Sequence, residues 1–84
     1  MSSVRQIQVR FFAILREQAG VATLTAESAA PDAAALYAEL QTRFPGLSFP
    51  ASLLKVSVNE RYAELTTPLA AGDRVVFIPP VAGG

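Results

Sequence analysis

The segment that most constrains the fold is the apolar run at residues 74–78, which Pro79-Pro80 brings to an end. Its last four residues are all apolar, without alternation, which is typical of a central strand that is covered on both faces. One long helix elsewhere in the chain can cover one face of this strand. No other segment is predicted to cover its second face, so part of the apolar surface is expected to face a partner.

Three other segments are predicted to form strands. Residues 4–13 and 54–59 alternate between apolar and polar side chains with a period of two. Residues 21–26 contain β-branched side chains and are predicted to form a strand antiparallel to the first. After a turn at Asn59-Glu60, a short extended piece is expected at residues 61–63. Three residues between the elements are predicted to pack inward: Phe49, Leu53 and Leu69.

One segment has helical spacing over three turns. Pro31 suits the first helical position and Asp32 suits the first turn, and the helix is predicted to end at Phe44. Residues 14–19 predict a short helical turn that Gly20 ends. The apolar residues at helical spacing are Ala33, Leu36, Tyr37, Leu40 and Phe44. Together these segments predict an α+β fold, in which a mixed sheet of four to five strands packs on one main helix.

Composition narrows the classes of function. The 84 residues suffice for one domain, expected at residues 1–78, followed by a flexible tail at residues 79–84. Seven basic and seven acidic residues give a net charge of zero, which favours neither nucleic acid nor an anionic membrane as a partner. The absence of Cys and His excludes disulfides and thiolate or imidazole metal sites. Without a signal-peptide pattern or a membrane-spanning run, a cytoplasmic protein is expected.

The chain ends in Val81-Ala82-Gly83-Gly84, and two interpretations of this end are open. Terminal residues are often frayed and small, so the diglycine can be structurally meaningless. Alternatively, the absence of a Cβ lets the backbone enter a narrow slot and leaves the terminal carboxylate of Gly84 unobstructed. No Ser-His or Cys-His pair is available, and the carboxylates form no paired motif, so catalysis by the chain alone is not expected.

Motifs along nearly the whole chain resemble one family. The run at residues 9–17, with Ala19-Gly20 after it, resembles the opening of the small subunit of molybdopterin synthase, the MoaD family of ubiquitin-like sulfur carriers. The later motifs follow in the family's order: Val58-Asn59, Pro68-Leu69, Gly72-Asp73, Phe77, Pro79-Pro80 and Gly83-Gly84. Ile78 departs from the second aromatic residue that the family often has before its diproline.

The resemblance implies a ubiquitin-like β-grasp and a protein that acts as half of an enzyme. An adenylating enzyme of the ubiquitin-activating type would use ATP to adenylate Gly84, and sulfur would replace AMP to give a thiocarboxylate. The tail would then enter the large subunit of molybdopterin synthase, with Gly83 supplying clearance. There it would deliver sulfur to a cyclic pyranopterin monophosphate, forming the dithiolene of the molybdenum cofactor. A heterotetramer and no permanently bound cofactor are expected.

The residues expected to contact the partner lie near the tail: Phe12, Phe77, Ile78, Pro79, Pro80, Val81 and Ala82. For Phe12, Phe77 and Ile78 a place in the core is the alternative, and for Phe77 the two alternatives are evenly balanced. Other functions also stay open. They are a sulfur carrier for thiazole or tRNA thiolation, a ubiquitin-like conjugation tag, and a non-catalytic β-grasp interaction module.

Overall fold

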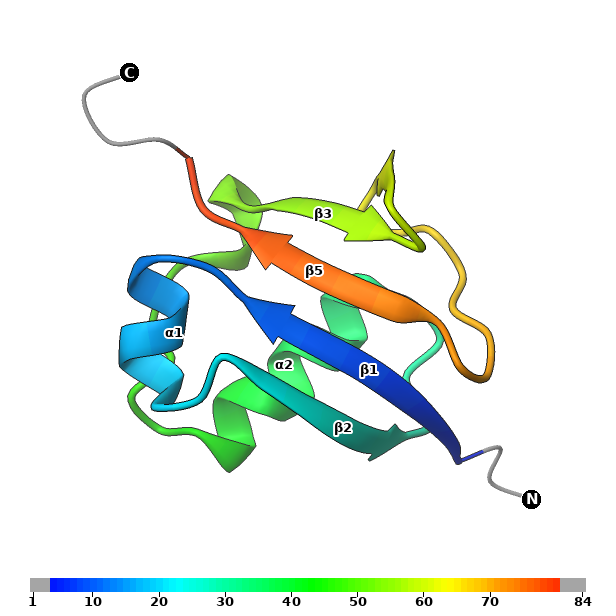
Figure 1. Ribbon diagram of the computed structural model, residues 1–84, viewed down its shortest axis with the longest axis horizontal. Coiled ribbons are helices and arrows are strands. Elements are labelled where there is room, and N and C mark those ends of the chain that lie inside the picture. Colours follow the sequence, from blue (N-terminus) through cyan, green and yellow to red (C-terminus); the bar gives the residue numbers. More distant parts are fainter. Residues whose placement is uncertain (1–3, 81–84) are drawn as a thin grey trace.

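A computed structural model describes residues 4–80, which form one five-stranded sheet and one main helix (Figure 1). The elements in chain order are β1 (Arg5–Phe11), α1 (Ile14–Ala19), β2 (Thr23–Ser28), α2 (Ala33–Arg43), the 3₁₀ turn η1 (Ala51–Leu53), β3 (Lys55–Val58), β4 (Arg61–Ala63) and β5 (Arg74–Ile78). The α+β prediction is therefore confirmed. Within the described part, no helix has the length and apolar character needed to span a bilayer.

The strand β5 lies at the centre of the sheet, as its apolar run predicted. The strand order is β2-β1-β5-β3-β4, with β5 parallel to β1 and antiparallel to β3. Phe77 in β5 is opposite Phe11 in β1 and opposite Val56 in β3. The strands β1 and β5 point the same way and end beside α1, while α2 crosses one face of the sheet (Figure 1).

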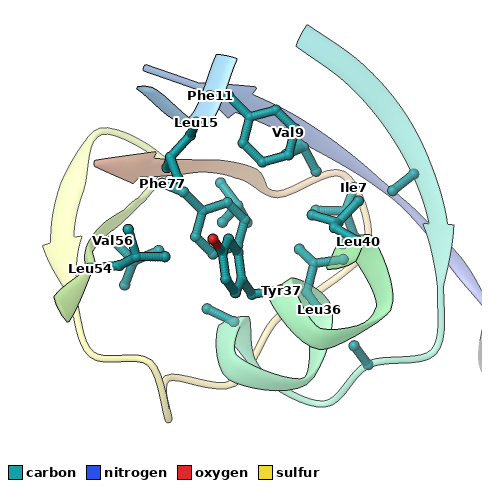
Figure 2. Close-up of a cluster of buried hydrophobic side chains, with 14 of the residues drawn as sticks. Ile7, Val9, Phe11, Leu15, Leu36, Tyr37, Leu40, Leu54, Val56 and Phe77 are labelled. Atoms are coloured by element: carbon teal, nitrogen blue, oxygen red, sulfur yellow. The ribbon is translucent and has the colours of Figure 1, made fainter. Parts of the chain in front are cut away.

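The core lies between α2 and the covered face of the sheet, and alternation along the strands builds it. In β1 the buried residues Ile7, Val9 and Phe11 alternate with exposed polar ones. Tyr37 of α2 lies against Phe77, with ring centroids 5.1 Å apart (Figure 2). Burying one such large side chain stabilises the fold by roughly 1.5–3 kcal/mol relative to its exposure. This packing fixes which side of β5 faces inward.

The main helix begins two residues later than Pro31. Asp32 is the N-cap, with extended backbone, and its carboxylate accepts a hydrogen bond from the Ala35 amide at 2.9 Å. The prediction of Pro31 as the first helical residue is therefore wrong, because capping by Asp32 satisfies a free amide of the first turn. The short helix α1 was predicted with the correct bounds, and Gly20 ends it in the left-handed conformation at φ 81°.

Two further expectations are corrected. The second strand begins at Thr23 and runs to Ser28, so it lies two residues later than predicted. Leu53 was expected to pack inward but is 56% exposed. Because β3 alternates and buries Val56, the inward position before it belongs to Leu54, which is 6% exposed. Leu69 is buried, and Phe49 packs partly buried against the core, as predicted.

Candidate functional site

The residues predicted to carry the chemistry, Gly83 and Gly84, lie outside the described residues, as do Val81 and Ala82. Their role stays a prediction. The structure does describe the base of this segment, where β5 ends. Pro79 is buried and Pro80 is exposed, so Pro79 still packs against the body of the domain. Pro80 is therefore the more accessible of the two prolines, and the predicted partner contacts of Pro79 and Pro80 stay predictions.

Alternation along β5 separates its apolar residues between the two faces of the sheet. Val75 and Phe77 are each 0% exposed and face the core. The predicted partner contact of the Phe77 side chain is therefore wrong, and the core alternative for it is confirmed. Val76 and Ile78 are partly buried and lie on the opposite face, which α2 does not cross (Figure 1). We call this opposite face of the sheet the open face.

Tyr62 is the largest exposed side chain on the open face. It is 84% exposed and is paired across β4 and β3 with Ser57, which in turn is opposite Val76. A hollow of about 220 Å³ is lined by Ser57, Glu60, Tyr62 and Ile78, which brings Tyr62 close to the end of β5. Sequence reasoning missed Tyr62. Its position in the middle of a short edge strand was the available signal.

Phe12 lies where β1 ends and is 39% exposed. Ala13, which follows it, has a φ of 54° and a ψ of −127°, and its carbonyl accepts the Arg16 amide at 3.0 Å. This sharp turn starts α1 and leaves Phe12 outside the core. Ile14, in the first turn of α1, is 40% exposed. Phe12 follows Phe11, which is opposite Phe77, so it lies near the end of β5, and Ile78 and Tyr62 line one hollow. We call Phe12, Ile78 and Tyr62 the apolar set.

Cationic side chains surround this apolar set. Arg10 and Arg74 lie on the open face, and Lys55 is opposite Ile78. The Arg10 guanidinium carbon lies 5.0 Å from the centre of the Phe12 ring, within range of a cation–π interaction. Arg74 is 3.5 Å from a carboxylate oxygen of Glu60. The open face therefore combines aromatic residues with arginines, a composition that is enriched in protein interfaces.

The open face exposes aromatic, aliphatic and arginine side chains. The chain has no Cys and no His, and in the described part no cluster of three potential metal-ligating residues is found. A second, wider depression of about 650 Å³ lies at the edge of the sheet, between the start of β3 and the segment after β4. Tyr62 lies between the two depressions. The side chains of the open face can form apolar, cation–π and ionic contacts with another molecule.

Comparison with known proteins places the chain among sulfur carriers. The model of the ThiS family matches residues 9–84. The molybdopterin synthase sulfur carrier subunit of Homo sapiens is 34% identical over 83 residues, which cover 94% of this chain and 94% of the relative. The subunit of the same name from Mycobacterium tuberculosis is 42% identical over 53 residues, covering 63% of this chain and 64% of the relative.

Solved structures share the architecture. The small archaeal modifier protein 1 of Haloferax volcanii superposes with a TM-score of 0.79 at 26% identity, covering 92% of this chain and 99% of that one. A chain in the complex of subunits 1 and 2 of the molybdopterin-converting factor from Helicobacter pylori gives a TM-score of 0.66 at 30% identity, covering 94% of this chain. The ubiquitin-like β-grasp implied by the resemblance is thereby confirmed. Because the family match spans residues 9–84 and the human relative aligns almost end to end, this chain belongs to the ThiS family, with molybdopterin synthase sulfur carrier subunits as its relatives.

Proposed function

We propose that the chain is the sulfur-carrier small subunit of molybdopterin synthase and acts in molybdenum cofactor biosynthesis in the cytoplasm. The observation that carries this proposal is the 34% identity to the human sulfur carrier subunit across 94% of both chains. The ordered motifs that lead into Pro79-Pro80 and Gly83-Gly84 support it further.

The reacting group in this proposal is the carboxylate of Gly84. A carboxylate is a poor electrophile, because its oxygen is a poor leaving group. A carboxylate oxygen attacks the α-phosphate of ATP in the adenylating enzyme, pyrophosphate leaves, and a mixed anhydride with AMP results. A sulfur nucleophile then displaces AMP and leaves a thiocarboxylate, which is anionic at neutral pH and nucleophilic, as thiolates are. Gly83 carries no side chain, so the segment fits a narrow channel.

The open face supports the docking step of this proposal. Phe12, Ile78 and Tyr62 offer exposed aromatic and aliphatic surface beside the point where the chain leaves the sheet. We assign the large subunit of molybdopterin synthase to this face, in keeping with the Helicobacter pylori structure, whose two subunits form a complex. Pro79 and Pro80 form the base of the reacting segment in this proposal, and the fixed φ of proline lowers the entropy lost on insertion.

Intact-mass spectrometry tests the covalent step. The chain is incubated with its adenylating enzyme, ATP and sulfide, and a gain of about 16 Da is expected, because sulfur replaces one oxygen. A variant without Gly84 should gain nothing. Adding the large subunit with the cyclic pyranopterin monophosphate should return the mass to its starting value. No gain in the unaltered chain, or a gain in the shortened variant, contradicts the proposal.

One observation favours a second candidate, a ubiquitin-like conjugation tag. The Haloferax volcanii structure, with its TM-score of 0.79, is of a protein named a modifier. If this chain acts as a tag, activated Gly84 forms an isopeptide bond with a lysine of another protein. Affinity purification under denaturing conditions separates the two candidates. Covalent conjugates support the tag, whereas a non-covalent complex with the large subunit, seen only under native conditions, supports the sulfur carrier.

A further inference from the structure

Two arginines line a hollow on the open face, next to the apolar set described above. The hollow has a volume of about 270 Å³, and its polar lining comes from Gln8, Arg10, Thr23, Glu60 and Arg74. Strand register explains this arrangement. Arg74 is opposite Gln8, and Arg10 is opposite both Val76 in β5 and Thr23 in β2, so the two arginines are diagonal neighbours on adjacent parallel strands. The pairing of β1 with β5 therefore places two cations side by side.

The charge of these arginines is only partly balanced. Arg74 contacts one carboxylate, that of Glu60, at 3.5 Å, and the two side chains are 58% and 83% exposed. This distance exceeds the 2.7–2.9 Å that is typical of a charge-assisted hydrogen bond. Within residues 4–80, Arg10 forms no ion pair, and its guanidinium rests on the ring of Phe12. The hollow thus presents more positive than negative charge to whatever covers it.

Other nearby carboxylates do not balance the arginines. Asp73 accepts hydrogen bonds from the Asn59 side chain at 2.9 Å and from the Ala70 amide at 2.7 Å, so it is engaged in the turn before β5. Glu27 is opposite Gln6, one row further along the sheet from the Gln8 and Thr25 pair. The contact between Glu60 and Arg74 shows that a carboxylate is accommodated at the rim of the hollow.

We propose that this hollow binds an acidic side chain of the protein that docks on the open face, with Arg10 and Arg74 contacting its carboxylate. This inference rests on the proposed function and assigns the acidic residue to the large subunit. Guanidinium groups bind carboxylates with two parallel hydrogen bonds, which gives the contact a defined geometry. The hollow includes Val76, and Ile78 and Tyr62 lie beyond it on the same face. A carboxylate flanked by apolar side chains complements this surface better than a free anion does.

The test compares binding of the full chain and its variants to the intact large subunit by isothermal titration calorimetry. The double variant Arg10→Gln/Arg74→Gln should bind about tenfold more weakly at low salt, because it leaves the partner's carboxylate without a counter-charge. The difference should shrink as sodium chloride rises from about 50 to about 300 mM, since salt screens the contact. Glu60→Gln should bind as tightly as the unaltered chain or more tightly, because it frees Arg74.

The matched control is Arg43→Gln. Arg43 also lies over an aromatic ring, at 5.4 Å from the centre of Phe44, but it belongs to the last turn of α2, away from the open face. It should bind within about twofold of the unaltered chain. Arg43→Gln removes one positive charge and the double variant removes two, so a loss of about threefold or more in the control, half of the double variant's effect in free energy, would assign the effect to net charge and overturn the inference. Thermal melting of each variant establishes that all of them fold.

Four further outcomes overturn the inference. Unchanged affinity and salt dependence in the double variant show that the hollow binds no acidic residue, while the proposed function stands. Weaker binding by Glu60→Gln shows that the partner presents a cation. Stronger competition by inorganic phosphate than by chloride at the same ionic strength indicates a free-anion site. If the unaltered chain does not bind the large subunit at all, the proposed function fails together with this inference.

Discussion

The two faces of β5 differ although they come from one strand of five residues. On the face that α2 covers, Val75 and Phe77 are fully buried and lie in a continuous core with Tyr37 and Phe11 (Figure 2). On the open face, Val76 and Ile78 are only partly buried, although they are as apolar as their neighbours. A strand at the centre of a sheet does not need apolar residues on an uncovered face.

This difference separates what folding requires from what a partner requires. The covered face obeys the rule that buried side chains must fill space without polar groups. The open face combines Tyr62 and Phe12 with Arg10 and Arg74, which neither pack in the core nor form a continuous network of ion pairs within residues 4–80. The proposed docking gives these open-face residues a role that folding does not, and the predictions below test this division.

The largest expected effect contrasts two consecutive residues of β5. Phe77→Ala should lower the free energy of unfolding by about 3–5 kcal/mol, because it leaves a cavity beside Tyr37 and Phe11. Ile78→Ala should lower it by about 1 kcal/mol or less, because its side chain is only partly buried. Urea unfolding followed by circular dichroism measures both. Equal losses would mean that the two faces are equally packed in the isolated chain.

The same pair should behave in the opposite way towards a partner. Ile78→Ala should fold normally and bind the large subunit about tenfold more weakly, since it removes an apolar contact near the centre of the proposed interface. Leu53→Ala is a suitable control because Leu53 is 56% exposed, lies in η1 and lines neither hollow of the open face. Weak binding by the Leu53 variant and normal binding by the Ile78 variant would show that the interface does not lie on the open face.

The two tyrosines provide a smaller contrast between the faces. The Tyr37 hydroxyl donates a hydrogen bond to the Phe49 carbonyl at 2.8 Å, whereas Tyr62 is 84% exposed. Tyr37→Phe should lower the free energy of unfolding by about 1 kcal/mol, because the carbonyl of Phe49 loses a donor. Tyr62→Phe should leave stability unchanged. Thermal or urea unfolding at neutral pH measures the difference.

The two Tyr→Phe variants should also differ in how their stability depends on alkaline pH. Burial raises the pKa of Tyr37 above its ordinary value of 10.0, because desolvation disfavours the phenolate. The unfolded chain therefore loses this proton at a lower pH than the folded chain does. The resulting contribution to stability is complete below about pH 10 and is lost as the pH rises through the raised pKa of the folded state. Tyr37→Phe should remove this part of the pH dependence, and Tyr62→Phe should retain it.

The covered face could be predicted from the sequence because its signals are local. The period of two over residues 4–13 predicted a strand with one buried face, on which Ile7, Val9 and Phe11 lie, and the apolar run of β5 predicted a central strand. Gly20 ended α1 where its left-handed conformation was expected. In each case the pattern within a few residues decides the structure, since alternation and capping depend on near neighbours.

The open face could not be predicted in the same way, because it depends on which strands are neighbours. Nothing local to Arg10 or Arg74, which are 64 positions apart, indicates that β1 and β5 are parallel and adjacent. Phe77 was evenly balanced between core and interface, because in a run of apolar residues the pattern does not tell the two faces apart. Its position opposite Phe11 and Val56 resolves the ambiguity.

The smallest expected effect concerns Ala13, a residue in the turn between β1 and α1. This turn leaves Phe12 exposed. Its φ of 54° and ψ of −127° are unfavourable for a residue with a Cβ and accessible to glycine. Ala13→Gly should therefore raise the free energy of unfolding by up to about 1 kcal/mol, after the greater entropy of glycine in the unfolded chain is subtracted. Ala38→Gly, at an exposed position inside α2, should lower it by about 1 kcal/mol.

If Ala13→Gly is more stable but binds the large subunit more weakly, the unfavourable turn serves to hold Phe12 on the open face. The contrast between the faces then extends to the backbone. A loss of stability on Ala13→Gly would show that the turn is not strained and would limit that contrast to the side chains.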